Sequence, residues 1–580
     1  MEYFFLIIFF SGSYYFANII NSKIFKKNND EILNIFSISI IFLLVYLINS
    51  YQLIFNIKGS FTNYFITIII CLSSFFYFKE ILKKKKFFFN FKEFNYLVLL
   101  ICFLYLILMG FQAADEDSLR YHLPIAKKIL EGSFFKNHWL DYITISSHEF
   151  INVLFLYINI DNGSSIINFI FLLLYFKAAV YFFKNNNLCN KDQSNLLIVL
   201  SSPYLVSLLT SQKLYFMPSL LVTLVFVYLY LNFKKIDNLK LHLMGLVIIF
   251  CFVTKATFTP YFILFFISVF WIKKNKKDVL FFYIYQFVAF LVIYFPILYI
   301  KNKIYNDPFI PFVSINSDNF EWYKQYKFWL TAWEMDYTDN IKNIFIKLLA
   351  TPLKLILPLS LSDIFKCLGI GILFIFTISN KNKYTFLLLI FFFLNVFLLF
   401  NTQARWFLPF LILISFLATF KKSQLLSKAI KIQSIAIIAL LIPLASLTIA
   451  QKINLIEKNY VKKLFIDSYK INVYLKENYK NKKIFTSLNT FFFFDNYVPI
   501  YYPEIILKID KNFYKKNYKN GDLILWDDRK NMSRFQSFEE FIKKSFDCNN
   551  FEHMKEFVFN SSRFFILNKR KKINLYRLKC

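Results

Sequence analysis

Residues 97–124 read LVLLICFLYLILMGFQAADEDSLRYHLP and contain the two features from which the rest of the chain is interpreted. The first half is an apolar run without a charge, and the second half places Asp115, Glu116 and Asp117 in succession after it. An apolar run of roughly 17–22 residues is long enough to cross the ~30 Å of hydrocarbon in a bilayer. The segment therefore predicts a membrane-spanning helix with an acidic cluster at its end.

Similar apolar runs recur almost to residue 450, and we count about fourteen of them. The chain is 57% hydrophobic and 21% aromatic, with a mean hydropathy of +0.47, which excludes a soluble enzyme or a disordered scaffold. We expect a polytopic α-helical membrane protein with about fourteen transmembrane helices. The expected centres are Phe10, Leu44, Ile70, Ile101, Leu172, Leu200, Leu224, Ile248, Phe265, Leu291, Leu373, Phe392, Leu413 and Leu440. The first run begins Met-Glu without a basic segment before it, so we interpret it as a span and not as a signal peptide.

The formal net charge of +32 has an explanation other than nucleic acid, for which we expect no binding. In a chain this apolar, basic residues hold loops on the cytoplasmic side of the membrane. Alternate loops are rich in Lys, whereas the loops between them hold about one basic residue each, namely Lys58, Lys213, Lys255 and Arg405. This alternation places the second set of loops on the external side, together with loops 113–163 and 302–350 and the tail after residue 452.

The first long external loop contains a helical pattern. Leu119, Leu123, Ala126 and Leu130 recur at helical spacing, Pro124 suits the first turn, and Gly132 suits the end of the helix. We expect an amphipathic helix that lies along the membrane surface.

The tail has a mixed pattern. Residues 483–487, 522–526 and 564–567 predict short strands, and the charged run at 568–572 predicts a hairpin turn, so we expect a small α/β domain over 452–580. Five of the seven cysteines are expected to be core residues, but Cys548 and Cys580 fall in the tail. A disulfide between these two is conceivable if the tail faces an oxidising compartment.

The acidic cluster is the main candidate for chemistry. Crowded carboxylates near a low-dielectric boundary tend to have raised pKa values, and they can act as a general base or bind a divalent cation, here through Asp115 and Asp117. The alternative is a solvated acidic loop that only ends a span.

Single cations on the same face strengthen the functional interpretation. Lys255 follows the eighth expected span, Arg405 precedes the thirteenth, and Lys213 is a weaker third candidate. A lipid-linked phosphate gives such cations a reason to be there, because Arg presents a planar fork to phosphate oxygens and Lys adds a compact charge. The alternative is contact with lipid headgroups.

These motifs resemble those of the GT-C glycosyltransferases. The acidic motif that continues as Asp-x-x-x-Tyr-His-Leu-Pro (117–124), the Thr-Lys at 254–255 and the Ala-Arg-Trp-Phe-Leu-Pro at 404–409 are similar to bacterial members that resemble protein mannosyltransferases and the lipid A aminoarabinose transferase. The resemblance covers residues 95–451, which would form the transmembrane catalytic module. Residues 1–94 would be an N-terminal extension of three further spans, which departs from the family's pattern.

The resemblance implies a function and a site. A sugar would pass from a polyprenyl-phosphate donor to a hydroxyl of a glycan, lipid or protein acceptor in the cell envelope, with inversion. Asp117 would be the catalytic base, with Asp115 and Glu116 as alternatives. Arg405 and Lys255 would hold the donor phosphate, and the further substrate-binding candidates are Tyr121, His122, Lys213 and Glu149. No cofactor is required, although a divalent cation is possible.

The expected setting is the inner membrane of a bacterium, with the site and the tail facing the periplasm. The alternatives are a lipid-linked oligosaccharide flippase or other transporter, an O-antigen polymerase or ligase, and a non-catalytic scaffold.

A second polar group contains His138, Asp141, His148 and Glu149, which can assist the first or belong to an interfacial belt. His148-Glu149 is not a zinc signature, because no second His follows at helical spacing. The aromatic loop at 319–339 is interpreted as an acceptor-side lid or as an interfacial anchor.

Overall fold

The computed structural model describes the helical part of the chain and most of the tail. The described residues are 2–24, 30–57, 60–84, 94–111, 115, 117–136, 145–185, 194–232, 236–273, 275–309, 352–358, 361–378, 390–391, 404–418, 423–457, 459–480, 482–488, 492, 496–500, 512–527, 538–548, 550–563 and 566–579.

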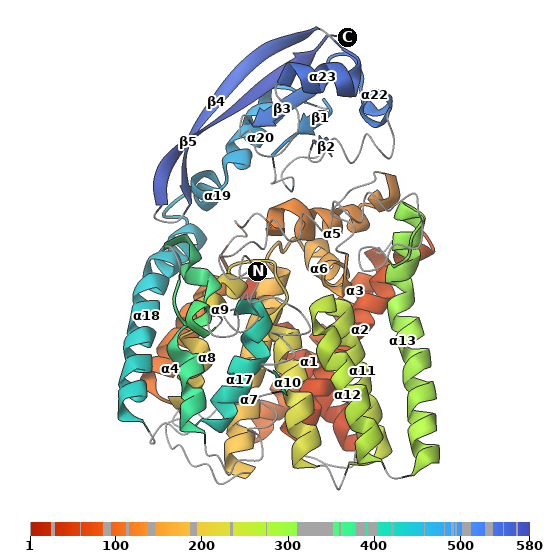
Figure 1. Ribbon diagram of the computed structural model, residues 1–580, viewed down its shortest axis with the longest axis vertical. Helices are drawn as coiled ribbons and strands as arrows, with labels where there is room; N and C mark the ends of the chain where they lie inside the picture. Colours follow the sequence, from red (N-terminus) through yellow and green to blue (C-terminus); the bar gives the residue numbers. More distant parts are fainter. Residues whose placement is uncertain are drawn as a thin grey trace, which may run out of the picture.

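Six described helices are long and apolar enough to cross a membrane, which is the architecture of a helical membrane protein. They are α1 (Glu2–Ile24), α2 (Glu31–Ile54), α3 (Ser60–Lys84), α7 (Gly163–Asn185), α13 (Lys276–Tyr305) and α18 (Gln424–Lys452). Shorter apolar helices run beside them (Figure 1), namely α4 (Tyr96–Met109), α10 (Phe216–Leu231), α11 (Asn238–Thr254), α12 (Thr259–Ile272) and α17 (Leu408–Leu417). The total of about fourteen spans stays a prediction.

Polar residues begin several of these helices. The side chain of Asp30 accepts a hydrogen bond from the backbone of Leu33, Asn95 accepts one from Leu97, and Asp237 accepts one from Lys240. Such caps satisfy backbone N–H groups that have no partner within the helix.

Two expected spans are not continuous α-helices. Around Leu200 the chain forms η5 (Ser194–Leu196), α8 (Leu197–Leu200) and, after a break at residues 201–202, α9 (Pro203–Leu209). The break follows from Pro203, which has no backbone N–H and favours an extended Ser202, observed at φ −66° and ψ 122°. Around Leu373 the chain instead forms the 3-10 helix η9 (Ile370–Thr377), which follows η8 (Leu361–Lys366).

The burial pattern separates the centre of the helical part from its outside. Residues 216–229 of α10 are all buried, and α10 contacts α7, α11 and α17. In contrast, α3 and α13 expose large apolar side chains such as Phe75, Phe281 and Phe287. Exposed apolar faces of this extent suit contact with lipid.

The tail contains a five-stranded sheet in the order β2-β1-β3-β5-β4. The strands are β1 (Ile484–Thr486), β2 (Tyr497–Pro499), β3 (Leu523–Asp527), β4 (Phe551–Arg563) and β5 (Ile566–Leu578). β1 pairs in parallel with β2 and β3, and β5 pairs antiparallel to β3 and β4. The helices of the tail are α19 (Tyr460–Phe465), α20 (Asp467–Asn478), α22 (Phe513–Asn517) and α23 (Phe538–Phe546).

The strands predicted at 483–487 and 522–526 are confirmed as β1 and β3, but the predicted hairpin turn is wrong. Residues 568–572 lie within β5, where Lys571 is paired with Phe559 and Lys572 with Val558. A charged run looks like a turn in the sequence, but the long β4–β5 ladder extends through it. Cys548 is disulfide-bonded, whereas Cys71, Cys102, Cys251 and Cys367 are thiols outside any disulfide.

The predicted loop helix is present as α5 (Leu123–Leu130), which carries Pro124 in its first turn and is followed by Gly132 at φ +67°. The sheet lies at the end of the molecule above α5 and α6 (Ser147–Tyr157), as Figure 1 shows. Leu119 and Leu123 are buried with Ile466 of the tail, so protein contacts cover part of the apolar pattern that we expected to face the membrane. The backbone N–H of Phe492 also donates to the carbonyl of Leu119 (3.0 Å).

Candidate active site

Asp117 stands at the start of a short π-helix, η2 (Ser118–His122), which continues directly into α5. Other short helical turns in the described part of the chain are η3 (Phe134–Lys136), η6 (Ala256–Phe258) and η11 (Ala404–Phe407). A π-helical turn is rare, and such turns are frequent at functional sites.

Asp115 caps this turn. Its carboxylate accepts hydrogen bonds from the backbone N–H of Ser118 (3.1 Å) and from the Ser118 hydroxyl. The Ser118 oxygen in turn accepts a hydrogen bond from the backbone N–H of Gln212 (2.7 Å), so the acidic loop is tied to the turn between α9 and α10. These contacts hold the carboxyl group of Asp115 in the turn, which suits a residue that positions the acidic loop.

The same turn brings Lys213 to the acids. Its Nζ lies 2.8 Å from Oδ2 of Asp117 and 3.5 Å from Oδ2 of Asp115. About a quarter of each side chain of the closer pair is exposed, 23% for Lys213 and 26% for Asp117. Lys213 was the weakest of the three cation candidates in the sequence, but it makes the most direct contact with the acids.

The two carboxyl groups differ electrostatically. Burial raises the pKa of Asp115, and the neighbouring charge of Asp117 adds to this effect, while Lys213 opposes it. Burial acts in the same direction on Asp117, but the charge and hydrogen bond of Lys213 outweigh it and hold the pKa of Asp117 below its usual value. Asp117 is therefore an ionised carboxylate at neutral pH.

Arg405 and Lys255 lie around one aromatic ring in the same site. The Nζ of Lys255 is 5.2 Å from the ring centre of Tyr215, and the Cζ of Arg405 is 5.9 Å from it. Arg405 also acts electrostatically on Asp117. Residues from four separate segments thus meet at one end of the helical part, although they are as far as 290 positions apart in the sequence.

Tyr215 is a site residue that the sequence reasoning missed. Burial raises the pKa of its hydroxyl, but the charges of Lys255, Arg405 and Lys213 outweigh burial and lower the pKa. A hydroxyl surrounded by cations can donate a hydrogen bond to an anion. The position of Tyr215, two residues after Lys213 in the turn before α10, was the only signal in the sequence.

A second polar cluster lies at the other end of η2 and is fully buried. The Nδ1 of His122 is 2.6 Å from Oε1 of Glu149, and the His122 and His148 rings are 4.3 Å apart between centres. The exposed fraction of His122 is 1%, and that of both His148 and Glu149 is 0%. Burial, with a contribution from Lys255 for His122, lowers the pKa of both histidines, so both are neutral.

Glu149, Ser146 and Ser147 hold the start of α6 in place. Oε2 of Glu149 accepts hydrogen bonds from the backbone N–H (2.8 Å) and the hydroxyl (2.9 Å) of Ser146 at the start of α6. The hydroxyl of Ser147 lies 2.9 Å from that of Thr254, next to Lys255. These contacts favour a structural role of Glu149 inside the loop over direct contact with a substrate. The same holds for His122, which is also buried.

The other sequence candidates have different outcomes. Tyr121 is half-buried, and its ring lies tilted against that of His122, with ring centres 4.2 Å apart. Glu116, His138, Asp141 and the aromatic loop at 319–339 lie outside the described residues.

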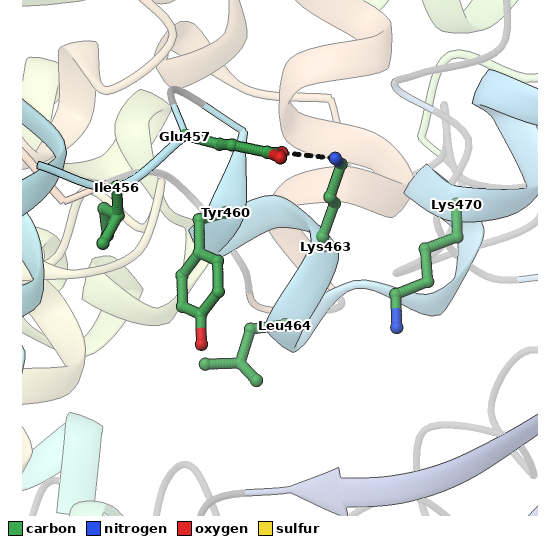
Figure 2. Close-up of a pocket in the computed structure, with 6 residues that line it drawn as sticks. All are labelled: Ile456, Glu457, Tyr460, Lys463, Leu464 and Lys470. Atoms are coloured by element: carbon green, nitrogen blue, oxygen red, sulfur yellow. Dashed lines mark hydrogen bonds and ion pairs between the residues drawn. The ribbon is translucent and has the colours of Figure 1, made fainter. Parts of the chain in front are cut away.

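A separate hollow of about 420 Å³ lies where the tail begins. Figure 2 shows its lining, with Tyr460, Lys463 and Leu464 on α19 and an ion pair between Lys463 and Glu457. It contains none of the residues of the acidic site, and its single ion pair is exposed, so we do not assign chemistry to it.

Comparison with family models, with curated proteins and with solved structures gave no match for this chain.

Proposed function

We propose that this protein is a glycosyltransferase that moves a sugar from a polyprenyl-phosphate donor to an acceptor hydroxyl. The observation that carries the proposal is the contact of an ionised Asp117 with Lys213, in a site where Arg405 and Lys255 flank Tyr215. A base candidate beside several phosphate-binding cations, at the end of a bundle of apolar helices, suits a substrate that has a phosphate and a lipid tail.

In the proposed reaction, the acceptor oxygen attacks the anomeric carbon as the bond between that carbon and the phosphate oxygen breaks. The proton of the acceptor hydroxyl passes to Asp117, and the lipid phosphate monoester is the leaving group. Its growing negative charge is stabilised by Arg405 and Lys255, which are in place before the reaction. Attack from the face opposite the phosphate inverts the anomeric carbon.

Lys213 gives the donor a way to activate the base. While Lys213 is paired with Asp117, the carboxylate has a low affinity for a proton. A donor phosphate that draws the ammonium group toward itself would weaken this pair and raise the proton affinity of Asp117. The base would then become effective only with the donor bound.

We place this site on the external face of a bacterial inner membrane. The Lys-poor loops that carry Lys213, Lys255 and Arg405 support this orientation. The disulfide at Cys548 adds support for an external tail, because disulfides persist in oxidising compartments. The tail contacts the residues after the acidic cluster through Ile466, and this contact supports a common side for both.

Transport is the less supported alternative. A transporter would be expected to have ionisable residues without local neutralisation within its spans. The candidate, Lys177 in α7, lies 3.8 Å from Glu31 at the start of α2, and Glu31 also accepts a hydrogen bond from Tyr14. This pairing is typical of a structural contact.

The test is transfer of radiolabelled sugar from a panel of polyprenyl-phosphate sugars to envelope acceptors, in membranes with equal amounts of protein. We expect transfer with the wild type and with Lys515→Gln, which removes only an exposed pair with Asp547. We expect no transfer with Asp117→Asn. Labelled lipid that crosses the bilayer without transfer to any acceptor would instead support a transporter.

A further inference from the structure

The buried cluster at the end of η2 has a chemistry that the proposed transfer reaction does not use. Within the described part of the chain, His122, His148 and Glu149 each offer a ligand atom, and these atoms lie within 4.8 Å of one another. The cluster joins η2 to the first turn of α6, which are separated in sequence by residues 123–146.

The hydrogen bonds around His148 determine which of its nitrogens carries a proton. The Ser164 hydroxyl donates to Oδ1 of Asn152 (3.0 Å), so its oxygen accepts the hydrogen bond from Nε2 of His148 (2.7 Å). The neutral ring then has its lone pair on Nδ1. A neighbour that fixes the tautomer in this way is typical of histidines that bind metals.

This lone pair is directed at a carboxylate. Nδ1 of His148 has no hydrogen-bond partner among the described residues and lies 3.6 Å from Oε1 of Glu149. Two lone pairs that face each other in a buried site repel unless a cation lies between them. Two ligands with bonds of ~2.1 Å to a tetrahedral Zn²⁺ are about 3.4 Å apart, which is close to the observed separation.

His122 supplies the third ligand. Its Nδ1 already contacts Oε1 of Glu149 at 2.6 Å, and its Nε2 is buried without a hydrogen-bond partner among the described residues. A metal that replaces the proton between these two atoms would bind the lone pair of Nδ1, and the single proton of the neutral imidazole would then be on Nε2. Both oxygens of Glu149 are held in place. Oε1 contacts His122, and Oε2 accepts two hydrogen bonds from Ser146.

We propose that His122, His148 and Glu149 form a binding site for a divalent transition metal, with Zn²⁺ as the ion that suits these ligands. Two imidazoles and one carboxylate are a zinc ligand set, whereas Mg²⁺ and Ca²⁺ prefer ligands that are all oxygen. The site is distinct from the pair of Asp115 and Asp117. Its metal would fix the end of η2 to α6 and so position the base at the start of η2.

Lys255 provides a second property by which the site can be recognised. It acts electrostatically on both His122 and His148, and its positive charge opposes the binding of a cation. Removal of that charge should therefore strengthen metal binding, which is an outcome that a purely structural group of side chains would not give.

The experiment uses the full-length protein in detergent, after treatment with a chelator and dialysis against Zn²⁺, with metal content measured by mass spectrometry. We expect about one Zn²⁺ per chain in the wild type and in Asp117→Asn, and loss of the metal in His148→Ala and Glu149→Gln. Titration with Co²⁺ should give the intense visible absorption of four-coordinate cobalt in the wild type, which requires no variant to fold. Lys255→Gln should bind Zn²⁺ more tightly than the wild type.

Two results would overturn the proposal. One is a wild type that holds no stoichiometric Zn²⁺ and gives no cobalt spectrum. The other is metal that is kept in His148→Ala but lost in Asp115→Asn or Asp117→Asn, which would move the ion to the acidic pair. Because metal content is measured without a transfer assay, these outcomes are independent of whether the protein transfers sugar.

Discussion

The two ends of the π-helix η2 carry opposite kinds of polar site. At its start, Asp117 and Lys213 are each about a quarter exposed, and further cations surround them. At its end, His122, His148 and Glu149 are buried and offer the lone pairs of two imidazoles and a carboxylate. Only five positions separate Asp117 from His122, so one short turn carries a partly exposed charge at one end and buried polar groups at the other.

The difference indicates how the two sites should respond to change. The open cluster contains partly exposed charges that solvent can reach, so we expect its variants to alter catalysis more than stability. The closed cluster has few alternatives for its polar atoms, so its variants should alter stability and metal binding. The predictions below test this division.

Among variants outside the acidic pair, the largest expected effect is on catalysis, from Arg405→Ala. Loss of a group that stabilises the leaving phosphate should lower kcat/KM by roughly 10²–10³-fold. Arg405→Lys is the matched variant, which keeps the charge but loses the planar fork. Its kcat/KM should lie between those of the wild type and Arg405→Ala. The Zn²⁺ content should be unchanged in both. Equal kcat/KM for all three proteins would remove Arg405 from the site.

An intermediate effect is expected from Lys213→Gln on the pH dependence of the reaction. In the wild type, Lys213 lowers the pKa of Asp117, so the carboxylate stays ionised as the pH falls through the mildly acidic range. Without Lys213, burial is opposed less and the pKa rises, so kcat/KM should begin to fall at a higher pH. The measurement is kcat/KM against pH for both proteins. An acidic limb at the same pH in both would show that Lys213 does not control the base.

The smallest effect is expected in the closed cluster, from Ser164→Ala. This change leaves the Nε2–H of His148 and Oδ1 of Asn152 without their shared partner, at a cost of about 1–3 kcal/mol in stability. Since Ser164 also fixes the His148 tautomer, we expect affinity for Zn²⁺ to fall by roughly 10–100-fold. Thermal unfolding and a zinc titration measure the two effects. Ser434→Ala in α18, which removes only a bond to the carbonyl of Ile430, is the control.

The sequence predicted the open site better than the closed one. Asp117, Lys255 and Arg405 stand out because a charge at the end of an apolar run is conspicuous. Lys213 was underrated, because its significance depends on the hydrogen bond from Gln212 to Ser118, which no local pattern shows. Tyr215 was missed for the same reason.

The closed site could not be found from local spacing. A zinc pattern was sought on one helix after His148, but the second histidine, His122, lies 26 residues before it on another element. Similarly, the Ser-Ser-Pro at 201–203 interrupts an expected span, although its flanks are apolar enough to hide the break. Hydropathy predicted where helices lie, but not which of their ends meet.

The central claim is that Asp117 is the base and that Asp115 only positions the loop. The most direct measurement compares kcat/KM for Asp117→Asn and Asp115→Asn, two changes of identical size two residues apart. We predict a loss of about 10²–10⁴-fold for Asp117→Asn, as expected for removal of a general base. Asp115→Asn should lose less than about tenfold, because its carboxyl group caps the turn. A full loss in Asp115→Asn with activity retained in Asp117→Asn would contradict the assignment.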